Sequence, residues 1–143
     1  MATNTSKPIA TTLPERVLVV EDDAILGLSI EQALEDAGVR HVEICPTSEL
    51  ALDALRREQP DAIVLDVHLA DRDDGWAIAE LVKTLGPDSP RIIFSTGMPG
   101  DIPEEIAALG SVLTKPYDAD TLIDLLRQPE RVGIISRLRG KLL

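Results

Sequence analysis

Short apolar runs rich in β-branched residues alternate along the chain with segments of helical spacing, and this alternation constrains the fold more than any other feature. A strand–helix–strand unit places its two strands parallel, with the helix packed on one face of the sheet. The sequence therefore predicts an α/β domain whose parallel sheet is covered on both faces. The five expected strands are RVLVV (16–20), HVEIC (41–45), DAIVLDV (61–67), RIIFS (91–95) and SVLT (111–114).

The expected helices are marked by their ends as well as by their apolar spacing. Asp23 precedes the first helix and Gly38 follows it, which is typical of an N-cap and of a helix end. Asp118 stands in the same position before the last helix, where we expect it to act as a cap. The other segments with helical spacing are 47–58, the stretch from Ile78 to Leu85, and 103–110, and the last helix spans 118–128.

Two of the strands, 16–20 and 61–67, are the most apolar and are therefore expected at the centre of the sheet. This placement favours the strand order 2-1-3-4-5 of a doubly wound, flavodoxin-like fold. In such a sheet, sites form beyond the carboxyl ends of the strands, beside the point where the winding reverses. In this order the reversal lies between the first and third strands.

Polar residues gather at the expected carboxyl ends of the strands. They are Glu21, Asp22 and Asp23 after the first strand, Asp66 on the third, Ser95 and Thr96 on the fourth, and Lys115 after the fifth. Crowded carboxylates repel one another, and the repulsion grows when they lose water. A hard divalent cation removes this conflict, because Mg²⁺ prefers oxygen ligands and takes one or two carboxylates together with phosphate oxygens and water.

The same residues can support transfer of a phosphoryl group to a carboxylate. Asp66 can act as a metal ligand, or as a nucleophile that forms an acyl phosphate. A metal and Lys115 would then offset charge on the transferring group, and Thr96 could donate to a phosphoryl oxygen. Each residue taken alone also has a plain structural explanation, as a turn, cap or surface residue. Their joint placement indicates a site, whereas Asp23 is interpreted as the cap of the first helix.

Composition narrows the class of protein. The chain has 143 residues, enough for one domain with a substantial core, and 44% of them are apolar. Its formal net charge of −11 disfavours direct nucleic-acid binding. Cys45 is the single cysteine, so no disulfide can form within the chain, which agrees with a reducing cytoplasm. No apolar run approaches the roughly 18 residues of a membrane span.

Four pieces of the sequence resemble the receiver domain of bacterial two-component response regulators. They are VLVVEDD (17–23), DAIVLDVHLADRDDG (61–75), RIIFSTG (91–97) and LTKPY (113–117). Each is weak alone, but all four occur in order and on the expected strands. We therefore divide the chain into a flexible N-terminal tail (1–15), a receiver domain (16–128) and a basic, amphipathic C-terminal extension (129–143).

The resemblance implies a phosphoacceptor and a set of metal ligands. Asp66 stands where the family has the aspartate that is phosphorylated. Glu21 and Asp22 match the acidic residues that bind Mg²⁺, with Asp22 the more direct ligand. Asp66 itself and the backbone carbonyl of His68 complete the protein ligands that the resemblance implies.

The resemblance also implies roles for two residues near the phosphoryl group, and the chain departs from the family pattern at one further position. Thr96 matches the hydroxyl that reports phosphorylation, and Lys115 matches the lysine that contacts the phosphoryl group. The Lys115–Pro116 bond is expected to be cis. Val112 occupies a position that is usually aromatic and turns inward on activation, so the usual coupling between threonine and an aromatic ring cannot operate here.

Two loops bear on how such a domain would respond. Ala70 replaces the usual proline four residues past the phosphoacceptor, and the loop before Gly75 is one residue longer than the commonest form. The segment TGMPGDIP (96–103) holds two glycines, which loosen a loop, and two prolines, which restrict it. We expect residues 97–110 to carry the conformational response instead.

The C-terminal extension differs in charge from the rest of the chain. Over 129–143, four basic residues and one acid give a charge of +3. A stripe formed by Ile135, Leu138 and Leu142 suits a helix that lies on its own domain, or a docking or dimerisation segment for an acidic partner. Disorder is the third alternative.

The expected function is that of a stand-alone receiver, rather than a conventional enzyme. A histidine kinase or histidine phosphotransfer protein would phosphorylate Asp66 in a Mg²⁺-dependent reaction. The phosphorylated protein would then bind a partner or pass the phosphate along a relay. The expected contact surface is the fourth helix, fifth strand and fifth helix, or the C-terminal extension. The chain could also form a homodimer. The alternatives are a Mg²⁺-dependent phosphohydrolase with Asp66 as nucleophile, disfavoured by His68 where a second acid is usual, and an interaction module that is not phosphorylated.

Overall fold

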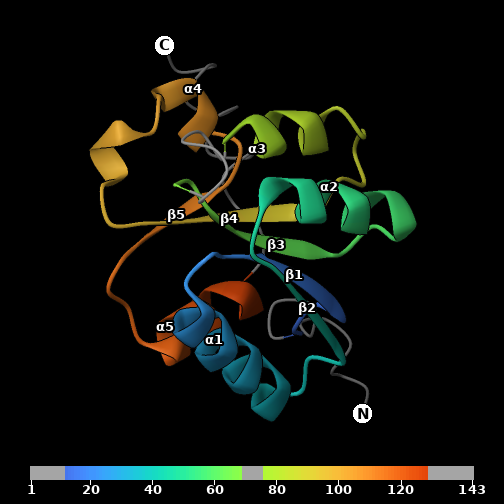
Figure 1. The fold of residues 1–143 in the computed structure, drawn as a ribbon, viewed down its shortest axis with the longest axis vertical. Coiled ribbons are helices and arrows are strands. Elements are labelled where there is room, and N and C mark those ends of the chain that lie inside the picture. Colours follow the sequence, from blue (N-terminus) through green and yellow to red (C-terminus); the bar gives the residue numbers. More distant parts are fainter. Residues whose placement is uncertain (1–11, 69–75, 129–143) are drawn as a thin grey trace, which may run out of the picture.

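The computed structural model describes residues 12–68 and 76–128. Within them, five parallel strands form a sheet of order β2-β1-β3-β4-β5, which confirms the predicted fold (Figure 1). The strands are β1 (Arg16–Val20), β2 (His41–Cys45), β3 (Ala62–Asp66), β4 (Arg91–Thr96) and β5 (Ser111–Thr114). The helices are α1 (Ala24–Ala37), α2 (Ser48–Arg57), α3 (Trp76–Lys83), the 3₁₀ turn η3 (Pro99–Asp101), α4 (Glu104–Ala107) and α5 (Ala119–Arg127).

The helices cover both faces of the sheet. α1 and α5 lie on one face, and α2, α3 and α4 lie on the other (Figure 1). Because successive side chains of a strand point to opposite faces, each face has its own aliphatic core. On the first face Val19 belongs to a cluster with Leu34 of α1 and Leu122 of α5. On the second, Leu65 of β3 clusters with Phe94 of β4.

The strands predicted to be central are inside the sheet. β3 is buried at all five positions, and it pairs with β1 on one side and β4 on the other. β2 and β5 form the two edges. The winding therefore reverses between β1 and β3, as the sequence predicted, and the carboxyl ends of these two strands lie side by side.

Of the two predicted helix caps, Asp23 makes the expected hydrogen bonds and Asp118 does not. Asp23 caps α1, since its Oδ1 accepts hydrogen bonds from the backbone N–H groups of Ile25 and Leu26 at 3.0 and 3.1 Å. Asp118 occupies the N-cap position of α5, but its side chain makes no capping hydrogen bond, so that prediction was wrong in its chemistry. The carboxylate of Asp118 stays exposed, and its backbone carbonyl accepts the N–H of Thr121 at 2.9 Å.

The helix expected over 103–110 is shorter than predicted. α4 spans only Glu104–Ala107, and the chain then turns into β5. Gly110 passes so close to β4 that a Cβ atom there would overlap the backbone carbonyl of Ile92. Glycine is therefore required at this position for steric reasons, although its φ angle is not in the left-handed region.

Three sequence predictions lie outside the described residues. They concern most of the N-terminal tail (1–11), the loop that contains Ala70 and Gly75 (69–75), and the C-terminal extension (129–143).

Candidate functional site

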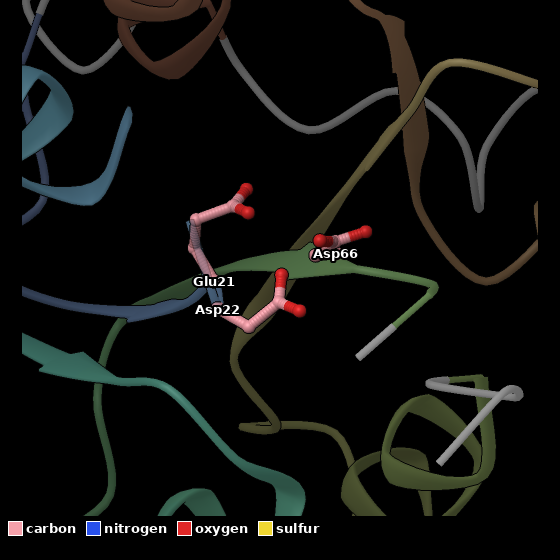
Figure 2. Close-up of side chains that lie close together, drawn as sticks. All are labelled: Glu21, Asp22 and Asp66. Carbon is pink, nitrogen blue, oxygen red and sulfur yellow. The ribbon is translucent and has the colours of Figure 1, made fainter. Parts of the chain in front are cut away.

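Three carboxylates meet where β1 and β3 end. Oxygen atoms of Glu21, Asp22 and Asp66 all lie within 4.8 Å of one another (Figure 2). Glu21 and Asp66 are buried, whereas Asp22 is exposed. The cluster thus has two fixed acids and one that is open to solvent, and it brings together the three acids that the sequence proposed as metal ligands.

Strand pairing explains why these acids meet. Val20 of β1 is in register with Leu65 of β3, so the next residues, Glu21 and Asp66, leave neighbouring strands at the same level. The N–H of Glu21 also donates to the backbone carbonyl of Cys45 on β2 at 3.1 Å, which fixes its backbone. The buried strands therefore hold the carboxylates in place despite their like charge.

Lys115, the residue that follows β5, lies next to the acidic cluster. Its Nζ lies 3.1 Å from Oε1 of Glu21 and 3.4 Å from Oδ2 of Asp66. Its backbone N–H donates to the carbonyl of Thr96 at 2.7 Å, which ties Lys115 to the end of β4. The Lys115–Pro116 peptide bond is cis, as the sequence resemblance implied. One ammonium group thus contacts two of the three acids.

The electrostatics of the site follow from burial and charge. Burial, reinforced by the charge of Asp66, raises the pKa of Glu21 to about 7. Burial opposes the charged form of Lys115, but the hydrogen bond to Glu21 and the charge of Asp66 outweigh it and raise the pKa of the ammonium group. The site therefore favours a positive charge between Glu21 and Asp66.

His68 lies on the segment that follows the phosphoacceptor candidate. Its backbone N–H donates to Oδ1 of Asp66 at 3.0 Å, so one oxygen of Asp66 is occupied by the backbone and the other faces Lys115. The imidazole is half-exposed, and its Nε2 lies 3.8 Å from Oδ2 of Asp101. The contact with Asp101, which belongs to η3, was not predicted from the sequence.

Thr96 and Ser95, the last residues of β4, are both buried. The Oγ1 atom of Thr96 accepts the backbone N–H of Met98 at 3.0 Å. The hydroxyl of Ser95 makes a 3.0 Å hydrogen bond with the hydroxyl of Tyr117, two residues past Lys115. From the sequence, Ser95 was expected only to lie at a strand end, and Tyr117 had no predicted role. Ser95 is in register with Asp66 across the β3–β4 pair, and this pairing could have indicated that Ser95 lies at the site.

Comparison with known proteins identifies the family. The family model for the response regulator receiver domain matches residues 17–127. The chain belongs to the response regulator receiver family. Its members act in two-component signalling rather than as conventional enzymes.

Individual relatives support this receiver assignment. The response regulator MprA of Mycolicibacterium vanbaalenii is 30% identical over 119 residues, which cover 80% of this chain and 50% of that protein. This chain thus spans about half the length of the curated relatives it matches. A CheY-like receiver domain from Methylobacillus flagellatus superposes with a TM-score of 0.71 at 24% identity, covering 81% of this chain and 98% of that one. The response regulator PhyR from Brucella abortus gives a TM-score of 0.66 at 26% identity, with coverages of 92% and 54%.

The acidic cluster of this receiver domain suits a hard divalent cation. Receiver domains typically bind Mg²⁺ at such a cluster, and Glu21, Asp22 and Asp66 supply oxygen atoms only. The exposure of Asp22 leaves that carboxylate accessible to a hydrated ion. The residues present therefore fit Mg²⁺, with Glu21, Asp22 and Asp66 as the side chains that would hold it.

The described part of this receiver domain contains no helix with the length and apolar character needed to cross a membrane.

Proposed function

We propose that this chain is a phosphorylation-dependent signalling protein that accepts a phosphoryl group on Asp66 from a histidine kinase or a histidine phosphotransfer protein. The observation that carries the proposal is the contact of Lys115 with both Glu21 and Asp66, beside the exposed carboxylate of Asp22. This arrangement supports the proposal, because a carboxylate oxygen, an ammonium group and a cluster of possible metal ligands lie together.

In the proposed reaction, a carboxylate oxygen of Asp66 attacks the phosphorus of a phosphohistidine. The new bond joins oxygen to phosphorus, the phosphorus–nitrogen bond breaks, and its electron pair returns to the imidazole, which takes up a proton from solvent. Lys115 neutralises charge on the transferring group, and Thr96, whose Oγ1 accepts the N–H of Met98, donates its own O–H to a phosphoryl oxygen. Mg²⁺, held by Glu21, Asp22, Asp66 and the carbonyl of His68, would neutralise further charge on the phosphoryl oxygens.

Labelling with a small phosphodonor tests this function. Wild-type protein with Mg²⁺ should take up phosphate, and Asp66→Asn should take up none, as seen on a phosphate-affinity gel. Asp36→Asn is the matched control, because Asp36 is an exposed carboxylate on α1, away from the cluster. Equal labelling of Asp66→Asn and the control would show that Asp66 is not the acceptor.

The surface beside Lys115 suits the approach of a phosphodonor protein. Ile25 and Leu28 of α1 are 82% and 61% exposed. Ile25 lines, with Pro116 and Tyr117, an open cavity of about 340 Å³ that reaches Lys115. We expect this apolar surface to bind the donor, since exposed apolar patches beside a reactive group are typical of interaction sites.

A comparison of two donors tests that surface. Ile25→Asp should slow phosphorylation by a phosphorylated histidine phosphotransfer protein, but not by a small phosphodonor. Leu50→Asp is the control, because Leu50 is an exposed apolar residue (47%) on α2, on the other face of the sheet (Figure 1). If Ile25→Asp slowed both donors equally, it would have damaged the site rather than a docking surface.

The output surface proposed for the phosphorylated form is the face formed by α4, β5 and α5, together with residues 129–143. Met98 is 60% exposed and Val112 is 38% exposed, so both offer apolar contact area near this face. Because Val112 replaces an aromatic residue, we propose that residues 97–110 carry the response. Amide exchange should then change most in 97–110 on phosphorylation, and a change confined to the segment around Asp66 would contradict this.

Domain limits and location complete the proposal. We propose that residues 16–128 act as the receiver, and that residues 129–143 bind an acidic partner or lie on the domain. The predicted tail is not flexible over its last residues, because Leu13 packs against the core and the carbonyl of Glu15 accepts the N–H of His41 at 3.0 Å. The single cysteine and the family's role in two-component signalling support a location in the cytoplasm. Whether the chain forms a homodimer can be tested by sedimentation before and after phosphorylation.

A further inference from the structure

The loop that carries the site lysine is attached to β4 at two points. At one end, the backbone N–H of Lys115 donates to the carbonyl of Thr96 at 2.7 Å. At the other, the hydroxyl of Tyr117 is 3.0 Å from the hydroxyl of Ser95. Between them stands the cis peptide bond of Pro116. Three consecutive residues, Lys115 to Tyr117, are thus held against the last two residues of β4.

Ser95 connects this loop to the phosphoacceptor. It is in register with Asp66 across the β3–β4 pair, and residues paired in this way project to the same face of the sheet. Ser95 is fully buried, so its hydroxyl cannot exchange Tyr117 for a bulk water molecule without a change in packing. Losing one partner of such a buried hydrogen bond leaves the other unsatisfied, which costs free energy.

Tyr117 lies beside the same site, since it lines the cavity that reaches Lys115. Burial, more than any other cause, raises the pKa of Tyr117, and the charges of Lys115, Glu21 and Asp66 also act on it. Its hydroxyl therefore remains protonated at neutral pH. It can donate to Ser95 or accept from it without adding a charge to a site that already holds three carboxylates.

We propose that Tyr117 is a positioning residue, whose hydrogen bond to Ser95 holds the Lys115–Tyr117 loop so that the ammonium group stays between Glu21 and Asp66. The proposal rests on the proposed function, because it assigns Tyr117 an effect on phosphoryl transfer to Asp66. A lysine side chain has several rotatable bonds, so its head group is placed only if its backbone is fixed. The two attachments to β4 supply that fixation.

A double-mutant cycle tests whether Tyr117 acts through Lys115. Tyr117→Phe keeps the ring and removes only the hydroxyl, so the loss of one buried hydrogen bond should lower the melting temperature by a few degrees and leave the protein folded at the assay temperature. Phosphorylation by a small phosphodonor should become about fivefold slower, the factor that corresponds to one hydrogen bond. Ser95→Ala should have the same effect. In a Lys115→Gln background, Tyr117→Phe should change the rate no further, whereas an equal slowing in both backgrounds would assign Tyr117 a general structural role and overturn the proposal.

NMR of the lysine side chains gives a readout that needs no phosphorylation. The sequence has four lysines (Lys7, Lys83, Lys115 and Lys141), so the signal of Lys115 can be assigned by substitution. Tyr117→Phe and Ser95→Ala should both shift the Lys115 Cε–Hε signal toward the position of a lysine in an unfolded peptide. If the Lys115 signal stays in place in both variants, the proposal is overturned. This test also decides when Lys115→Gln is phosphorylated too slowly for the double-mutant cycle to be measured. If the wild-type protein takes up no phosphate, the proposed function fails. The NMR experiment then still tests whether Tyr117 positions Lys115.

Discussion

The ammonium nitrogen of Lys115 lies 3.1 Å from Oε1 of Glu21, a side chain that is only 2% exposed. A buried carboxylate is costly unless it is paired, and in the absence of metal Lys115 is the cation that pairs with it. The same ammonium group reaches Asp66 at 3.4 Å. When all three acids are ionised, Lys115 leaves the site with a charge of −2, which a divalent cation would balance.

Removing this ammonium group should destabilise the metal-free protein. Lys115→Gln leaves Glu21 and Asp66 without a counter-charge, so we expect the free energy of unfolding at pH 8 to fall by about 1 to 3 kcal/mol. Urea unfolding in the presence of a chelator measures it. Arg56→Gln is the control, because the Arg56–Asp53 ion pair is exposed and should contribute less than about 1 kcal/mol. Equal losses in the two variants would mean that Lys115 acts as an ordinary surface charge.

Magnesium should stabilise the fold. A ligand that binds only the native state at about 100 times its Kd adds about 2.7 kcal/mol, which raises the Tm of a domain of this size by several degrees. Thermal unfolding with and without Mg²⁺ measures this gain, and a chelator should reverse it. Asp22→Asn should abolish the gain, whereas Asp36→Asn should retain it. The metal assignment is wrong if Asp22→Asn and the wild-type protein gain equally.

Much of this architecture could be predicted from the sequence, because strand ends are a local signal. Apolar runs fixed the position of β1 and β3, and once these strands are neighbours, Glu21 and Asp66 must meet at their carboxyl ends. The N-cap role of Asp23 is equally local, since it depends on two backbone N–H groups within three residues.

Contacts that depend on side-chain reach and loop geometry could not be predicted in this way. Lys115 follows β5, which is separated from β3 by β4, yet its long side chain contacts Glu21 beyond β3. The hydrogen bond between Ser95 and Tyr117 depends on the path of the loop after Lys115, and no spacing rule describes that path. The close approach of Gly110 to β4 is likewise a tertiary contact that no local pattern describes.

Gly110 should tolerate no side chain. The methyl group in Gly110→Ala would overlap the backbone carbonyl of Ile92, a buried residue of β4 that is in register with Ile63 of β3. We expect a loss of about 3 kcal/mol or more in the free energy of unfolding, at the upper end for overpacked sites. Gly100→Ala is the control, because nothing lies within 4 Å of a Cβ atom at Gly100. Comparable urea midpoints for the two variants would contradict the steric explanation.

Cys45 should make the fold sensitive to alkaline pH. Burial, with a smaller contribution from the charge of Glu43, raises the pKa of its thiol from 9.0 to about 11. Between pH 9 and pH 11 the unfolded chain therefore loses this proton while the native state keeps it, so stability is intact below pH 9 and falls as pH rises. Two pKa units correspond to about 3 kcal/mol. Urea unfolding across this range should show a shallower fall for Cys45→Ala than for the wild-type protein, and parallel curves would mean that the thiol ionises equally in both states.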